Sequence, residues 1–232
     1  MNPAEALPAS GLVLFFVLGL RHGVEPDHIA AIDGMTLRAL DHRQPHAAWT
    51  GSLFALGHGA AIAAVAIIVG LLAARVTLPP MLVAITDWLP IVLLALLGTW
   101  NLRALLAPGH YQPSSVRMRL MPAALRERSD MWSTIAIGLL FALVIDTLAH
   151  ISAWSVFATH QGGGWLAALI AGLLFSVGML VASTASSQLI YRLIGSARTE
   201  AATATFRRAI GWFVVTLSFG VVAIAVAEKL GT

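Results

Sequence analysis

Long apolar stretches alternate with shorter polar segments along the 232 residues of this chain. The apolar stretches fall at 9–31, 50–74, 83–106, 132–158, 163–190 and 208–229. Each is long enough for a helix to cross the hydrocarbon core of a bilayer, which takes about 20 residues. The pattern predicts an all-α fold, a polytopic membrane helix bundle with about six transmembrane helices.

The composition supports this class of protein. Hydrophobic residues make up 58% of the chain and charged residues 11%, and the mean hydropathy is +0.83. The lipid bilayer is therefore the expected surrounding. Cysteine is absent, which excludes a disulfide framework and a thiolate metal site. The basic residues are scattered through short loops, so the high isoelectric point does not indicate a nucleic-acid partner. Residues 1–10 lack the basic region of a cleaved signal, so the first apolar stretch is expected to be retained.

The arginines predict the topology. They are Arg38 and Arg43 after the first stretch, Arg103, Arg117, Arg119, Arg126 and Arg128 at or after the end of the third, and Arg192, Arg198, Arg207 and Arg208 around the connection from the fifth to the sixth. The other connections and ends carry only Arg75 and Lys229. By the positive-inside rule, a multi-pass protein of the prokaryotic cytoplasmic (inner) membrane is expected, with both termini on the non-cytoplasmic side.

A weak internal repeat divides the single transmembrane domain, 1–232, into a first half at 1–107, a cytoplasmic loop at 108–130 and a second half at 131–232. Gly51-Ser-Leu-Phe-Ala-Leu-Gly57 resembles Gly172-Leu-Leu-Phe-Ser-Val-Gly178. Equivalent halves of three helices each would run in opposite directions, as in the inverted repeats of many secondary transporters. The alternative is coincidence, since Gly and Leu are common in membrane helices. The repeat predicts a site between the first, second, fourth and fifth helices.

The most informative segment is His22-Gly-Val-Glu-Pro-Asp27-His28, inside the first apolar stretch. Ionisable groups at membrane depth are costly and usually mark an ion pathway. In an unbroken helix His22 and His28 would lie on different faces, about 240° apart. Pro26 should open the helix, because it lacks an amide donor and clashes with the carbonyl four residues earlier. An unwound turn would bring both imidazoles, and the Asp27 carboxylate, to one divalent transition metal ion.

Three more polar residues are candidate ligands. His58 lies between glycines in the second stretch, although a lone histidine in a helix is often a simple polar contact. Asp146 and His150 are four residues apart in the fourth stretch and share a helix face; a hydrogen bond between them without metal is the alternative. Glu25 is one turn from Arg21, and their mutual neutralisation is favoured over metal ligation by Glu25. The hydroxyl-rich fifth helix, at 183–188, either lines a pathway or joins helices.

These motifs resemble those of the nickel/cobalt transporter (NiCoT) permeases. The family signature His-x4-Asp-His matches His22, Asp27 and His28, and its Leu-Gly-His motif matches Leu56-Gly57-His58. A Phe-Asp-Thr-Ala-Thr-Glu motif is similar to 145–150, where His150 replaces the glutamate. In the fifth helix Gly178-Met179 matches, but Ser183 and Ser186 stand where the family has aspartates. The family usually has eight membrane helices, against about six in this sequence.

The resemblance implies a secondary permease, not an enzyme, that moves Ni²⁺ or Co²⁺ by alternating access, with no cofactor. The expected metal ligands are His22, Asp27, His28, His58, Asp146 and His150. Cu²⁺ and Zn²⁺ are also compatible with nitrogen ligands. The sequence contains no P-loop, so ATP coupling would require another subunit. Two alternatives stay open: a metal-binding sensor or accessory subunit, and a membrane metalloenzyme with a histidine-based site.

Overall fold

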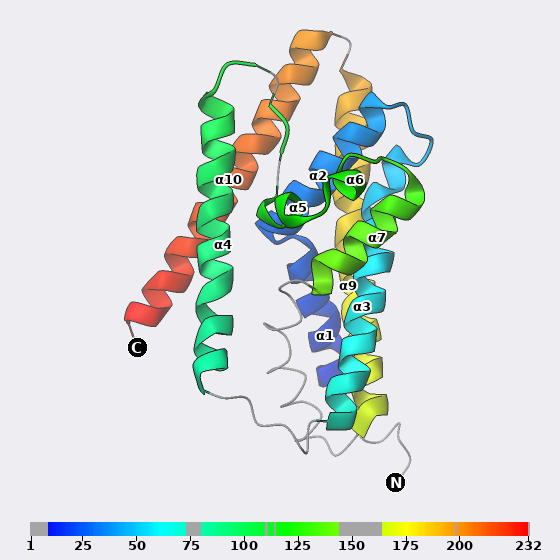
Figure 1. Cartoon of the computed structure of the whole chain (residues 1–232), viewed down its shortest axis with the longest axis vertical. Helices are drawn as coiled ribbons and strands as arrows, with labels where there is room; N and C mark the ends of the chain where they lie inside the picture. The colour runs from blue at the N-terminus through cyan, green and yellow to red at the C-terminus, as the bar shows by residue number, and fades with distance from the viewer. Residues whose placement is uncertain are drawn as a thin grey trace.

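A computed structural model describes residues 9–72, 80–109, 111–113, 115–143, 164–197 and 199–231. Within these ranges the regular structure is helical and no strand occurs (Figure 1). The elements are α1 Ala9–Gly23, α2 Pro26–Asp41, the short 3₁₀ helix η2 Ala47–Trp49, α3 Thr50–Leu72, α4 Pro80–Leu106, α5 Val116–Leu120, α6 Ala123–Arg126, α7 Met131–Phe141, α9 Gly164–Ser196 and α10 Glu200–Leu230. The helical fold class predicted from the sequence is confirmed for the described residues.

Among the described residues, four helices are long and apolar enough to cross a membrane. They cover Ala47–Leu71, Trp88–Leu106, Trp165–Ser196 and Glu200–Leu230. Gly11–Gly23 and Met131–Phe141 are apolar but shorter. The chain is therefore a multi-pass membrane protein, whereas six spans remain a prediction. The first predicted span is divided into two helices, and much of the fourth, 132–158, falls outside the described residues.

The helix break expected at Pro26 is present. Helix α1 ends at Gly23, and Pro26 occupies the first turn of α2, where its missing amide costs no hydrogen bond. The His22 carbonyl instead accepts a hydrogen bond from the Glu25 amide at 3.1 Å. Helix α2 then continues to Asp41, ten residues beyond the expected end of the span. Asp33 therefore lies buried within α2.

Glycines allow two helix pairs to cross at backbone contact. A Cβ atom at Gly57 of α3 would lie 1.9 Å from the Ile135 carbonyl oxygen, and one at Gly138 of α7 would lie 2.0 Å from that of Phe54. The α1–α9 crossing has the same form: a Cβ at Gly19 would meet the Phe175 oxygen at 2.0 Å, and one at Gly178 the Phe16 oxygen at 2.1 Å. Only glycine fits these four positions. In each crossing, both helices contribute one glycine to the contact.

The helices form two groups (Figure 1). Helices α1, α3, α7 and α9 pack together, α4 packs along α10, and α2 contacts members of both groups. The segment predicted as a long cytoplasmic loop, 108–130, is more ordered than a simple connection. It contains α5 and α6, and Met118 and Met121 join the hydrophobic cluster that includes Ile32 of α2 and Phe54 of α3. This segment therefore covers one side of α2.

Candidate metal site

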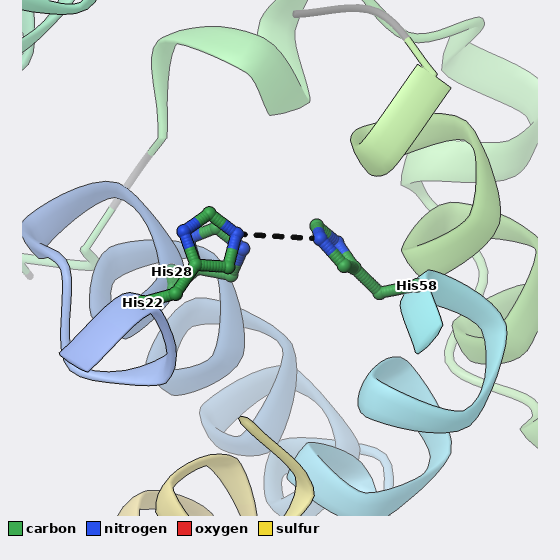
Figure 2. Close-up of side chains that lie close together, drawn as sticks. All are labelled: His22, His28 and His58. Carbon is green, nitrogen blue, oxygen red and sulfur yellow. Dashed lines mark hydrogen bonds between the residues drawn. The ribbon is translucent and has the colours of Figure 1, made fainter. Parts of the chain in front are cut away.

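Three histidines meet where α1, α2 and α3 come together. His22 is in the last turn of α1, His28 in the first turn of α2, and His58 in the middle of α3. At most 2% of each residue is exposed. Figure 2 shows the imidazoles of His22 and His28, from α1 and α2, close together and facing that of His58 from α3. One nitrogen from each ring lies within 4.8 Å of the others. The two motifs singled out in the sequence therefore form one cluster.

The spacing of the nitrogens suits a shared metal ion. The Nε2 atoms of His22 and His58 are 3.4 Å apart, which is long for a hydrogen bond. Two nitrogens bound to one tetrahedral ion by bonds of about 2.0–2.1 Å lie about 3.4 Å apart. The ring centroid of His28 is 4.2 Å from that of His22 and 5.0 Å from that of His58. One nitrogen of His28 lies within 4.8 Å of a nitrogen of each of the other two rings.

Aromatic side chains surround the cluster. Phe175 of α9 is 5.2 Å from His22, Phe141 of α7 is 5.1 Å from His28, and Phe54 of α3 is 5.7 Å from His58, measured between ring centroids. All three phenylalanines are buried. These rings leave the imidazoles with few polar neighbours, and neutral imidazole is the form that binds metal. The phenylalanines were not singled out from the sequence, because an aromatic residue in a membrane helix is unremarkable there.

Glu25 supports the site from the helix break. Its Oε2 atom lies 3.1 Å from Nδ1 of His22. A carboxylate at that position favours the tautomer with the proton on Nδ1, so the lone pair is on Nε2, facing His58. Glu25 was expected to be structural as the partner of Arg21. Its proximity to His22 has the i,i+3 spacing of neighbours on a helix face, so the sequence offered this partner as well as Arg21.

Asp27 lies outside this histidine cluster, although it was predicted to be a ligand. Its Oδ2 atom pairs with Nε of Arg117 at 2.8 Å, and its Oδ1 atom accepts a hydrogen bond from the Ser115 hydroxyl at 2.5 Å. Ser115 also caps α5, and Arg117 is in its first turn. Both partners are buried. In the sequence, Arg117 served only to predict the membrane topology by the positive-inside rule.

The remaining predicted ligands, Asp146 and His150, lie outside the described residues. The hydroxyl-rich part of α9 makes helix contacts. Thr184 is hydrogen-bonded to Ser52 at 2.8 Å, and Ser187 donates to the Ala48 carbonyl at 3.1 Å. Ser186 donates to the buried Asp33 carboxylate at 2.9 Å. These contacts favour the role of joining helices.

Proteins named as nickel or cobalt transporters are similar in sequence to most of this chain. The chain is 33% identical to the cobalt transport protein NhlF of Rhodococcus rhodochrous over 82% of its length, covering 62% of that protein. It is 29% identical to the nickel transporter NixA of Staphylococcus aureus over 74% of its length, covering 58% of that protein. Identity to the nickel transporter NicT of Mycobacterium tuberculosis is also 29%, over 73% of this chain and 53% of NicT. The chain thus spans less than two thirds of each relative.

No solved structure matches the chain. The NicO family, described as high-affinity nickel-transport protein, matches residues 10–232. This match includes both histidine motifs and all three clustered imidazoles, and it confirms the resemblance inferred from the motifs. The chain belongs to the NicO family of high-affinity nickel-transport proteins.

Proposed function

We propose that this protein is a secondary permease for a divalent transition metal ion, Ni²⁺ or Co²⁺, and that His22, His28 and His58 form its central binding site. The observation that carries the proposal is the convergence of three buried imidazoles at a broken helix of a multi-pass membrane protein. Broken helices are where transporters place their substrate sites. The names of the relatives, which include both nickel and cobalt transporters, support these two ions.

The three histidines are suitable ligands for an ion that has to be bound and then released. Three neutral imidazoles provide borderline nitrogen donors, which bind Ni²⁺, Co²⁺, Cu²⁺ and Zn²⁺. They leave coordination positions open for water or for further ligands. Asp27, Asp146 and His150 remain proposed ligands, and Asp27 would join the histidines in another conformation. The apolar enclosure around the histidines would hold the ion away from bulk water until the site opens.

Alternating access between two halves is the proposed mechanism. The glycine crossing of α1 with α9 and that of α3 with α7 support an inverted repeat. Gly178 of α9 and Gly57 of α3 occupy matching positions in the two repeated segments, and each is close to the backbone of its partner helix. Such crossings let helices pivot at backbone contact without separating. The histidines lie beside both crossings, so a change in either pair would alter access to the ion.

The proposed orientation places the arginine-rich connections on the cytoplasmic side. In Figure 1 the α2–α3 connection, the end of α4 and the α9–α10 connection all lie at the upper end of the molecule. Arg43, Arg103 and Arg192 belong to these segments, whereas Arg117, Arg119 and Arg126 lie on α5 and α6. This arrangement supports a location in the prokaryotic cytoplasmic membrane with both termini on the other side. The His22, His28 and His58 side chains would then be reached from opposite sides in turn.

Metal uptake into proteoliposomes tests the proposal. Purified protein would be compared with H28A, which removes one clustered imidazole, and with H42A. His42 is exposed and its Nδ1 contacts the Ser129 hydroxyl at 3.0 Å, outside the cluster. We expect Ni²⁺ or Co²⁺ flux in the wild type and H42A, and loss of flux in H28A. Stoichiometric binding without flux under a metal or proton gradient would instead support a sensor or accessory subunit.

A further inference from the structure

The buried Asp27–Arg117 pair sits directly beside the histidine cluster. Asp27 is the neighbour of His28 in the first turn of α2. The Arg117 guanidinium carbon is 4.8 Å from the centre of the Phe141 ring, whose other contacts include His28 at 5.1 Å. One aromatic ring therefore packs against both the arginine and a proposed metal ligand. Only 8% of the Asp27 side chain and 6% of the Arg117 side chain are exposed.

The ion pair also fixes α5 on α2. Ser115 donates to Oδ1 of Asp27 and accepts a hydrogen bond from the Met118 amide at 3.4 Å. Arg117 pairs with the other carboxylate oxygen. Both oxygens of Asp27 are thus engaged by the start of α5. This arrangement holds the carboxylate on α5 and accounts for its position outside the histidine cluster.

A bound divalent ion would change this balance of charge. The three imidazoles are neutral as ligands, so the ion would bring two positive charges into an apolar enclosure. Arg117 already contributes a third positive charge nearby, and the carboxylates of Asp27 and Glu25 together offset only two of the three. In a medium of low polarity a carboxylate is strongly attracted to the nearest cation. The metal ion and the Arg117 guanidinium are therefore competitors for the same carboxylate.

We propose that Arg117 is a positioning residue that controls whether Asp27 reaches the metal ion. In the metal-free protein Arg117 holds the carboxylate on α5. When the histidines take up a divalent cation, Asp27 exchanges from the guanidinium to the ion, and α5 loses both of its contacts with that carboxylate. Metal binding is in this way coupled to release of α5 from α2. The proposal rests on the proposed metal site and adds a residue from the connecting segment to its mechanism.

The test is Ni²⁺ affinity of the purified full-length protein, measured by equilibrium dialysis in detergent micelles. R117Q removes the competing cation, so it should bind Ni²⁺ about tenfold more tightly than the wild type, because the carboxylate no longer has to be drawn from a partner. R117K should be intermediate, since lysine keeps the charge but lacks the planar fork of arginine. The gain should vanish in D27N/R117Q, which has no carboxylate to release.

R119Q is the matched control. Arg119 is also on α5 and carries the same charge, but it is exposed and stacks on Trp100 at 3.6 Å. R119Q should bind Ni²⁺ as the wild type does. Equal affinity of R117Q and R119Q, or a gain that persists in D27N/R117Q, would overturn the inference. Should R117Q not elute as a folded protein, the Ni²⁺ affinity of R117K is compared with that of the wild type and R119Q instead. Failure of the wild type to bind Ni²⁺ would overturn the proposed function itself.

Discussion

His22 and His58 are 36 positions apart in the chain, yet their Nε2 atoms lie 3.4 Å apart. The contact joins the end of α1 to the middle of α3 and is completed by His28 at the start of α2. Each helix supplies one imidazole. The cluster therefore depends on the relative position of three helices, and it responds to any movement among them. A site of this kind is suited to binding an ion in one conformation and releasing it in another.

Removal of any one clustered imidazole should weaken metal binding. We expect H22A, H28A and H58A each to lower Ni²⁺ affinity by more than tenfold, because even loss of an outer-shell partner typically costs about 10–100-fold. Isothermal titration of the purified protein measures this. H42A should retain wild-type affinity, since His42 lies outside the cluster. Equal affinities for H58A and H42A would exclude His58 as a ligand.

Glu25 should tune the site without being essential. In E25Q the charge that favours the proton on Nδ1 of His22 is lost. We expect Ni²⁺ affinity to fall by roughly tenfold, at the low end of the outer-shell range, and by less than in H22A. E200Q is a suitable comparison, because Glu200 is exposed in the first turn of α10. A loss as large as that of H22A would show Glu25 to be a direct ligand.

The α3–α7 crossing should not tolerate a side chain at its glycines. G138A would place a Cβ atom 2.0 Å from the Phe54 carbonyl oxygen, so the helices would have to separate. Overpacking of this kind costs about 1–3 kcal/mol or more. Thermal unfolding in detergent should show a lower midpoint, and Ni²⁺ affinity should fall because Phe54 and Phe141 border the histidines.

Gly220 provides the control for this prediction. It lies in α10, and a Cβ atom there would meet no atom within 4 Å. G220A should be neutral or slightly stabilising, since alanine is favoured over glycine in a helix by about 1 kcal/mol. If G138A and G220A unfolded at the same temperature, the close α3–α7 contact would be refuted.

Asp130 should stabilise the start of α7 in a pH-dependent way. Its carboxylate accepts hydrogen bonds from the Ser133 hydroxyl at 2.7 Å and the Ser133 amide at 3.0 Å. These bonds, with help from Arg128, hold the pKa of the Asp130 carboxyl well below its usual range. D130A should lower the free energy of unfolding by about 1 kcal/mol at neutral pH, as for other helix caps.

The sign of the pH effect follows from the lowered pKa. The cap contributes fully above the pKa of an unfolded aspartate, about 3.9, and its contribution is lost as the pH falls further toward the lower folded value. Unfolding of wild type and D130A should therefore differ from pH 5 to 8 and converge in strong acid. A difference that stayed constant down to pH 2 would mean that the carboxylate does not stabilise the cap. Denaturant titration at several pH values measures this.

Features encoded within a few neighbouring residues could be predicted from the sequence. The helical class follows from the length of the apolar stretches, and the break follows from the missing amide of Pro26. The separate motifs at 22–28 and 57–58 indicated metal ligands because buried imidazoles in a membrane helix need a reason. The end of α2 was missed, since Asp33 and Arg38 interrupt the apolar pattern although the helix continues through them.

Only the tertiary structure decided how these residues are combined. The glycine crossings set how closely α1, α3, α7 and α9 approach, and that distance places His58 against His22. The fold also buries Arg117 on Asp27, although its position in an arginine-rich connection indicated only the topology. Local sequence specifies helix propensity and chain breaks through backbone chemistry. The partner of a buried charge is chosen by packing between distant segments, because it depends on which surfaces the folded helices bring into contact.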